Sequence, residues 1–125
     1  MRIAFPLLAG LLAAVALIGC APPPQPKAGP PPFKVSFRKS PIPNQGMVAN
    51  VNNPLTTESI KVLVVFVQGK NEKEERSYRL DHEVKPLDSL SVGWAELKGW
   101  TLMPGDKLRL LCEGYSADLA CAVPD

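Results

Sequence analysis

The chain of 125 residues has room for one folded domain and no more. Two of its 14 basic residues, Arg2 and Lys27, lie in N-terminal segments that the arguments below place outside that domain. Residues 33–125 then hold 14 − 2 = 12 basic residues against 12 acidic ones, so the formal charge of +2 does not indicate a basic surface. The composition therefore excludes nucleic-acid binding of the electrostatic kind and leaves a small neutral domain.

The first 20 residues resemble the signal peptide of a bacterial lipoprotein. Met1-Arg2 is followed by an uncharged apolar run over 3–18, and Leu17-Ile18-Gly19-Cys20 matches a lipobox. A membrane-spanning helix would be longer and would end in a charged cluster, whereas prolines follow here. An ordinary secretory signal would have small residues in an A-x-A arrangement, which 15–19 fit poorly.

The lipobox resemblance implies that residues 1–19 are removed and that Cys20 carries a diacylglyceryl thioether, usually with a further acyl chain on its amine. More than one chain is needed because a single short chain holds a protein to a bilayer only marginally. Ala21 is not acidic, which favours the periplasmic face of the outer membrane over the inner membrane in hosts with the enteric sorting system.

Ala21 to Pro32 reads APPPQPKAGPPP, with seven prolines in twelve residues. Proline fixes φ and removes a donor, so the segment is expected to stay out of the sheets as a polyproline II spacer. At roughly 3.1 Å per residue it would extend about 35 Å. The sequence thus predicts a leader over 1–19, a lipidated cysteine and tether over 20–32, and a β-domain over 33–125.

From Phe33 onward apolar residues recur with period two, which predicts strands separated by turns rich in Pro, Gly and Asn. The strongest strand prediction covers Ile60–Val67, where apolar residues on both faces indicate a central strand in the middle of the core. Its expected faces are Ile60, Val62, Val64 and Phe66 against Leu63, Val65 and Val67. The other strands are expected over 33–38, 47–52, 77–84, 89–97, 108–112 and 119–123, and the charged stretch 69–76 is interpreted as a solvated hairpin tip.

Cys112 and Cys121 remain as a pair once Cys20 is assigned to the anchor. Folding the chain back about Ser116-Ala117 puts Cys112 opposite Cys121 and Leu110 opposite Val123, so one register serves both the apolar face and a disulfide. In an exported protein such a pair is normally oxidised. The sequence therefore predicts a Cys112–Cys121 bridge that closes a loop of about ten residues.

Seven short strands with frequent turns predict an all-β, immunoglobulin-like sandwich of two sheets. The pattern resembles the FxLYD-type and related modules of bacterial envelope proteins. The matching residues are Gly46–Asn50 with the asparagines after them, Ile60–Phe66, and Lys85-Pro86-Leu87-Asp88, where Leu87 replaces the glycine of an L-x-P-G turn. The resemblance implies a binding or spacing role and supplies no catalytic residues.

Residue types that carry chemistry are sparse. His82 is the only histidine, and its neighbours Asp81 and Glu83 should point away from it across the strand, so no metal site is expected. No nucleophile elbow, phosphate loop or zinc motif occurs, and no cofactor is predicted. A hydrolase using a carboxylate pair among the acids stays open as an alternative, although nothing in the sequence singles out a pair.

The candidate binding surface consists of Trp94, Trp100 and Met103. Trp94 is in phase with Leu90 and Val92, which predicts a core position, whereas Trp100 follows a glycine in a stretch typical of a loop. We expect a non-enzymatic, lipid-anchored envelope protein that binds a protein partner. The alternative is a carbohydrate or peptidoglycan binder that uses an exposed Trp100, because aromatic side chains concentrate binding energy.

Overall fold

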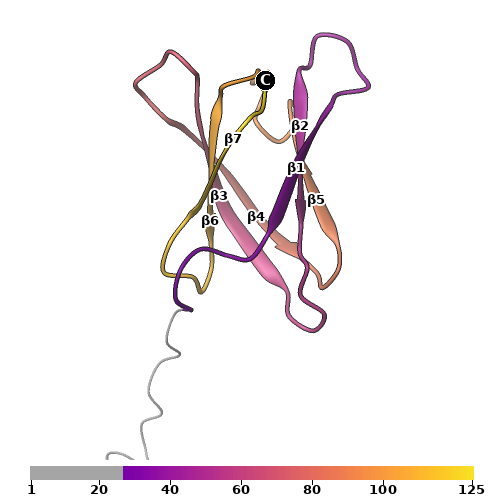
Figure 1. Cartoon of the computed structure of the whole chain (residues 1–125), viewed down its shortest axis with the longest axis vertical. Helices are drawn as coiled ribbons and strands as arrows, with labels where there is room; N and C mark the ends of the chain where they lie inside the picture. The colour runs from indigo at the N-terminus through magenta and orange to yellow at the C-terminus, as the bar shows by residue number, and fades with distance from the viewer. Residues whose placement is uncertain (1–26) are drawn as a thin grey trace, which may run out of the picture.

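A computed structural model describes residues 27–125, which form two antiparallel sheets packed face to face (Figure 1). This confirms the predicted all-β sandwich of seven strands; the leader and Cys20 lie outside the described residues. Residues 27–125 contain no helix with the length and apolar character needed to cross a membrane. The strands are β1 (Lys34–Lys39), β2 (Met47–Asn52), β3 (Ile60–Gln68), β4 (Arg76–Val84), β5 (Ser89–Val92), β6 (Lys107–Cys112) and β7 (Leu119–Ala122).

The strands are ordered β1-β2-β5 in one sheet and β4-β3-β6-β7 in the other. An immunoglobulin constant domain pairs its fourth strand with the sheet of the first, second and fifth. Here β4 pairs with β3 instead, as the short hairpin 69–75 between them favours. Strand β3 therefore has neighbours on both sides, β4 and β6, as predicted for a central strand.

The sandwich has two ends with different loops (Figure 1). We call the end that carries Lys27 and the connections 53–59, 85–88 and 113–118 the proximal end. The distal end carries the connections 40–46, 69–75 and 93–106, together with the C-terminus. The described chain thus enters at one end and finishes at the other.

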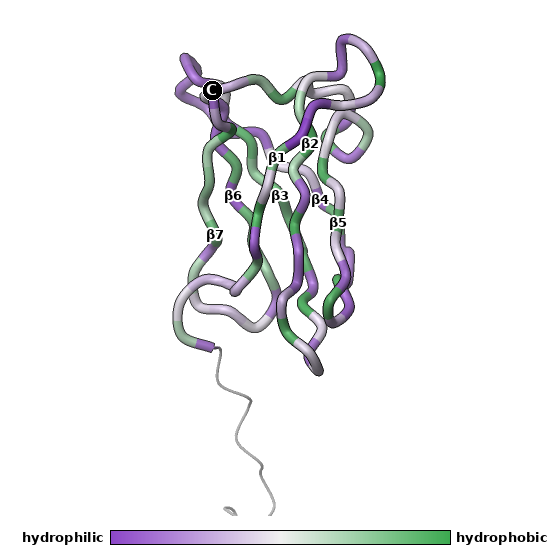
Figure 2. Tube along the Cα trace, turned by 45° about the vertical axis from the view of Figure 1, so that its right-hand side comes forward, coloured by the Kyte–Doolittle hydropathy of each residue, from purple (hydrophilic) through white to green (hydrophobic). Residues whose placement is uncertain are grey.

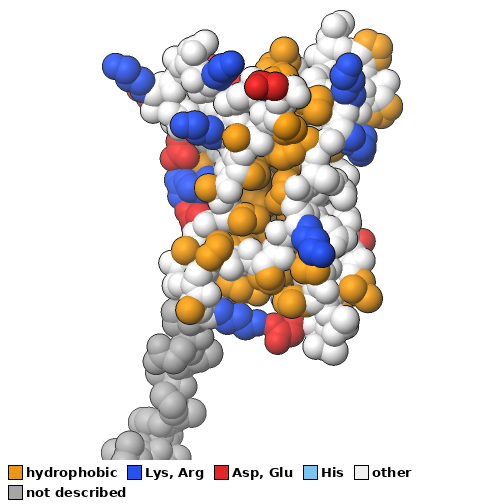
Figure 3. Space-filling view, viewed as in Figure 1, with side chains coloured by type: hydrophobic (Ala, Val, Ile, Leu, Met, Phe, Trp, Pro, Cys, Tyr) orange, Lys and Arg blue, Asp and Glu red, His pale blue; other side chains and the backbone are white. Residues whose placement is uncertain are grey.

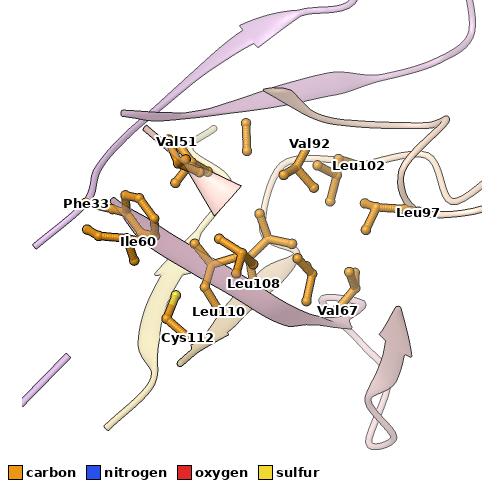
Figure 4. Close-up of a cluster of buried hydrophobic side chains, with 14 of the residues drawn as sticks. Phe33, Val51, Ile60, Val67, Val92, Leu97, Leu102, Leu108, Leu110 and Cys112 are labelled. Atoms are coloured by element: carbon orange, nitrogen blue, oxygen red, sulfur yellow. The ribbon is translucent and has the colours of Figure 1, made fainter. Parts of the chain in front are cut away.

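Hydrophobic and hydrophilic residues alternate along the strands, and the hydrophobic ones fill the space between the sheets (Figures 2 and 4). Burial of one Val or Leu side chain contributes about 1.5–3 kcal/mol, so this layer is the main source of stability. The core residues come from both sheets and from the loop after β5: Phe33, Ala49, Val51, Ile60, Val62, Val65, Val67, Val84, Val92, Leu97, Leu102, Leu108, Leu110, Cys112 and Val123.

A β-bulge corrects the predicted faces of β3. The pairing of β3 with both of its neighbours shifts between Val62 and Val64, so the alternation changes phase there. Val62 and Val65 both point into the core, and Val64 and Phe66 are only half-buried. The prediction that Val62, Val64 and Phe66 share a face was therefore wrong, because a period-two pattern cannot reveal an inserted residue.

The observed register of β6 and β7 contradicts the predicted disulfide. Cys121 lies opposite Leu108, and Leu110 lies opposite Leu119. Cys112 is therefore four residues along β6 from Leu108, the residue that faces Cys121. Four residues of strand span about 13 Å, beyond the roughly 7 Å between Cα atoms that a disulfide tolerates. Both cysteines are free thiols, and Cys112 lies in the core (Figure 4).

A segment that the sequence assigned to the tether packs beside this hairpin. Residues 27–32, here called the strap, lie against the β6–β7 loop rather than standing clear as a spacer. The backbone N–H of Lys27 donates to Gly114 O at 2.8 Å and that of Ser116 to Lys27 O at 2.9 Å, in a parallel bridge. Residues 114–116 thus belong to a loop that is bonded to the strap, and they do not form the tight turn that a disulfide register needs. Residues 27–32 therefore pack on the sandwich, although the sequence assigned them to the tether.

Side-chain contacts strengthen the strap. The ammonium of Lys27 pairs with Glu58 and lies 5.5 Å from the ring centroid of Tyr115. The N–H of Gly29 donates to Ser116 Oγ at 2.8 Å, and Pro31 is fully buried. The strap is consequently fixed to the proximal end from both its backbone and its side chains.

Asn53 fixes the other proximal connections. Its side chain is fully buried and donates to the carbonyls of Glu58 at 2.8 Å and Val84 at 3.0 Å, while its Oδ1 accepts from the N–H of Leu55 at 3.0 Å. A buried amide is stable only when its polar atoms are satisfied in this way. Asn53, in the predicted Asn-Pro turn, therefore joins the β2–β3 connection to the β4–β5 connection through its side chain.

Candidate interaction surface at the distal end

Trp94 lies on the surface, against the prediction of a core position. Strand β5 ends at Val92, and Gly93 begins a turn in which its carbonyl accepts from the N–H of Leu97 at 3.0 Å. The alternation that made Trp94 in phase with Val92 stops at this turn, so its indole is 41% exposed and Leu97 enters the core in its place.

Trp100 is half-buried and packs against the core. Its indole N–H donates to Asp106 Oδ2 at 3.3 Å, and the guanidinium carbon of Arg76 lies 4.5 Å from the centroid of its ring. Both the polar edge and one face of the ring are therefore occupied within the chain. Trp100 acts as a link between the loop 93–106 and the start of β4.

Asp106 organises this loop around the predicted Pro-Gly turn. The N–H of Asp106 donates to Met103 O at 3.1 Å and Gly105 has φ +91°, the geometry of a type II turn. Its buried carboxylate also accepts from the N–H of Met103 at 3.0 Å and from the N–H of Lys70 at 3.3 Å. The loops 69–75 and 93–106 are thus held together by one side chain.

Met103, the third residue of the predicted surface, is 53% exposed and lies beside Ile42, which is 54% exposed. Together they border an open groove of about 360 Å³ at the distal end, here called the distal groove. Hydrophobic side chains gather over the β1–β2 loop in the space-filling view (Figure 3). The residues that line the groove are Lys39, Ser40, Ile42, Pro43, Asn44, Gly46, Met47, Met103 and Pro104.

The walls of the distal groove are fixed by a close contact between two loops. Gly46 pairs with Leu102 in a parallel bridge, and the N–H of Met47 donates to Leu102 O at 2.9 Å. Gly46 has φ +68°, and a Cβ at this position would lie 2.3 Å from Leu102 O. Only glycine allows this approach, so the backbone contact between the two loops depends on Gly46.

Arg109 ties the hairpin 69–75 to the outer face of the same sheet. Its guanidinium carbon lies 3.9 Å from the centroid of Phe66, and it forms ion pairs with Asp118 and, at 2.8 Å, with Glu75. Hydrogen bonding from Arg109 lowers the pKa of Glu75, so this carboxylate stays ionised at a lower pH than an ordinary glutamate does. These contacts cover the apolar outer face of β3 with charge, which explains why both faces of that strand are hydrophobic.

Within residues 27–125, the side chains with potential for catalysis do not meet in a buried site. His82 lies on β4 opposite Val62 and is exposed. Asp81, Glu83 and Glu113 line an open depression of about 480 Å³ at the proximal end, and all three side chains are exposed to solvent. In the part of the chain that the structure describes, no group of three or more His, Cys, Asp or Glu residues could hold a metal ion.

No protein-family model matches the chain. The search of curated proteins gave no significant match. No solved structure resembles it significantly.

The sequence reasoning found Met103 but missed Ile42 and the prolines beside it. Ile42 lies between Pro41 and Pro43, and an apolar residue flanked by prolines cannot join a strand, so its exposure could have been predicted. Its position opposite Met103 depends on the pairing of Gly46 with Leu102, which no local pattern indicates.

Proposed function

We propose that the chain is a lipid-anchored protein of the cell envelope whose β-sandwich has no catalytic activity and binds a protein partner through the distal groove. The observation that carries the proposal is the placement of this groove at the opposite end of the sandwich from Lys27 (Figure 1). An anchor at Cys20 lies seven residues before Lys27, so it would place the membrane at the proximal end and the groove would face away from the lipid.

The groove has the composition of a protein contact. Ile42, Met47 and Met103 present aliphatic and thioether groups, and methionine is over-used at surfaces that accept other proteins. Exposed apolar side chains that are grouped rather than scattered mark interaction sites. Lys39 at the rim offers a charged contact at the edge of the interface.

In-cell photocrosslinking tests the partner site. A photoreactive amino acid at Met103 should give a discrete adduct with an envelope protein, whereas the same amino acid at Glu113, which is exposed at the proximal end, should give none. Adducts of equal yield at both positions, or at neither, would contradict the proposal.

The anchor is tested separately with Cys20→Ser. The variant should lack lipid and keep its leader, because in the bacterial lipoproteins that the sequence resembles the leader is cleaved only after the thiol has been lipidated. Normal maturation and membrane retention of this variant would contradict the anchor while leaving the partner site standing.

A second candidate function is glycan binding through Trp94 rather than Trp100. The 41% exposure of Trp94 favours it, since a solvent-facing indole can stack on a sugar ring. With Trp100→Phe as background, Trp94 is the only tryptophan left, so quenching of its fluorescence by peptidoglycan fragments reports on this site alone. Unchanged fluorescence at millimolar glycan would dismiss this candidate.

A further inference from the structure

Among the strands of residues 27–125, β7 lies at the edge of its sheet, with β6 as its one neighbour. Its sequence, Leu119-Ala120-Cys121-Ala122, contains no charge and no proline, whereas the edge strand β1 carries three cations and β4 is charged and bulged. Natural proteins protect exposed edges with such charges and bulges. The fourth edge strand, β5, is also short and uncharged, but β7 differs from it in two further respects.

The first is that the same edge already accepts backbone just before β7. Lys27 pairs in parallel with Tyr115, and the N–H of Ala117 donates to Gly29 O at 3.2 Å. The strap then reaches Pro30–Pro32, which have no N–H to donate and leave the edge. The pairing therefore ends immediately before β7 for a reason that lies in the strap and not in β7.

The second is the direction of the free backbone groups. The N–H of Val123 donates to Asp106 O at 2.8 Å, toward β6. Because these directions alternate along a strand, Leu119 and Cys121 also face β6, and Ala120 and Ala122 direct their N–H and C=O groups outward. Both alanines are exposed, and their methyl groups leave room for the approach of another strand.

The two sides of this edge would select different side chains. Leu119 and Cys121 share the inner face with Leu108 and Leu110 and are only half-buried. A hydrophobic stripe is visible between the two sheets (Figure 3). On the outer face a groove of about 370 Å³ runs along Ala120, Ala122, Arg109 and Lys107.

Lys107 lies directly opposite Ala122 and, among the described residues, forms no salt bridge, whereas Arg109 is already paired with Glu75 and Asp118. We propose that β7 accepts an extended segment of a partner protein as a fifth strand of this sheet, with apolar side chains over Leu119 and Cys121 and an acidic side chain beside Lys107. This mode of recognition uses backbone hydrogen bonds for affinity and alternate side chains for specificity.

A second copy of the chain does not suit this edge. Antiparallel pairing of β7 with another β7 would put the two Lys27 residues at opposite ends of the dimer. Two copies anchored to one membrane as proposed above could not adopt that arrangement. The exclusion of a second copy rests on the proposed anchor, whereas the exposed backbone groups of β7 do not depend on it.

The test uses the full chain in detergent and a displayed library of random twelve-residue peptides. Selected peptides should alternate apolar residues with polar or acidic ones and should lose at least tenfold in affinity for Ala120→Pro, which removes one outward N–H and no bond to β6. Ala120→Ser keeps that N–H and is the matched control. Lys107→Glu should change the preferred charge of the peptides from acidic to basic, whereas Lys73→Glu on the hairpin tip should not.

Several results would overturn the proposal. These are failure to select any peptide, equal binding to wild type and Ala120→Pro, and a dimer in light scattering that Ala120→Pro abolishes. Peptides that lose affinity for Met103→Lys but not for Ala120→Pro would bind at the distal groove, which supports the proposed function and refutes the edge. Should Ala120→Pro unfold, protection of the Ala120 and Ala122 amides from hydrogen exchange by bound peptide decides the question, and unchanged exchange refutes it.

Discussion

Trp100 donates its indole N–H to the carboxylate of Asp106, six residues further along the chain, at 3.3 Å. The same carboxylate accepts backbone N–H groups from Met103 and Lys70, so a single buried side chain satisfies donors of two distal loops. The order of the distal groove therefore depends on Asp106 as much as on the residues that line it.

Asp106→Ala should lower the free energy of unfolding by about 2–4 kcal/mol, because it leaves three partly buried donors without their acceptor. Urea unfolding followed by tryptophan fluorescence measures the loss. Glu74→Ala, at an exposed position of the hairpin, should change stability by less than about 0.5 kcal/mol and serves as the control. Equal effects of the two substitutions would contradict the role of Asp106.

Asn53→Ala should also be strongly destabilising, by roughly 2–4 kcal/mol, since three backbone carbonyls and one N–H lose a buried partner. Asn53→Asp is the informative comparison. It keeps the acceptor for Leu55 but replaces the donors to Glu58 and Val84 with a buried charge that faces carbonyl oxygens, so it should be at least as harmful as the alanine. An aspartate variant of wild-type stability would show that the donors are dispensable.

Leu87→Gly should stabilise the domain. Leu87 has φ +62° in the turn closed by the N–H of Asp88 and Lys85 O, and its side chain is 65% exposed. The left-handed conformation is unfavourable by about 1–2 kcal/mol for a residue with a Cβ, while glycine is penalised by roughly 0.5–1 kcal/mol for its freedom in the unfolded chain. A net gain of a few tenths to about 1 kcal/mol should raise the melting temperature by several degrees. Leu87→Val should lower it, and the opposite order would contradict the turn geometry.

Both thiols should react in the non-reduced, denatured protein and react slowly in the native one. Burial raises the pKa of Cys112 to about 12 and also raises that of Cys121, so few thiolates form near neutral pH. Titration with a chromophoric disulfide reagent measures the number of reactive thiols in the denatured protein and their rate of reaction in the native protein. A denatured protein without free thiols would restore the predicted disulfide and contradict the observed register.

The same pKa shift predicts a dependence of stability on pH. A thiol whose pKa is higher in the folded state contributes fully below its unfolded pKa, and the contribution is lost as pH rises from there toward the folded value. Between pH 9 and 11, wild type should therefore lose stability more steeply than Cys112→Ala, although the variant is less stable at pH 7. Parallel curves would contradict the burial of this thiol.

The strands were predictable because each has a local cause. The alternation in Lys34–Lys39 and Met47–Asn52 and the turn residues between them depend only on neighbours in the sequence. The seven-strand sandwich follows from such patterns once the chain is long enough to fill one core.

What could not be predicted depends on contacts between distant segments. The loop before β7 pairs with Lys27, which is distant in the sequence. An even shift of the β6–β7 register leaves the apolar face unchanged, so the hydrophobic pattern alone could not reject the disulfide. The core position predicted for Trp94 was wrong because the alternation of β5 ends at the turn that begins at Gly93, and no change in composition marks that turn. The distal groove needs two loops 60 residues apart, such as those of Ile42 and Leu102, to meet.

The strap also determines how the domain would respond to mechanical force. Among residues 27–125, a pull applied at Lys27 loads the bonds to Gly114, Ser116 and Ala117 before any other backbone bond of the domain. These few bonds would peel apart one at a time, whereas the six-residue ladder of β1 with β2 follows only afterwards. Release of residues 27–32 would lengthen the free chain by about 20 Å while the sandwich stays folded. Under load, the strap would therefore detach and extend before the two sheets unfold.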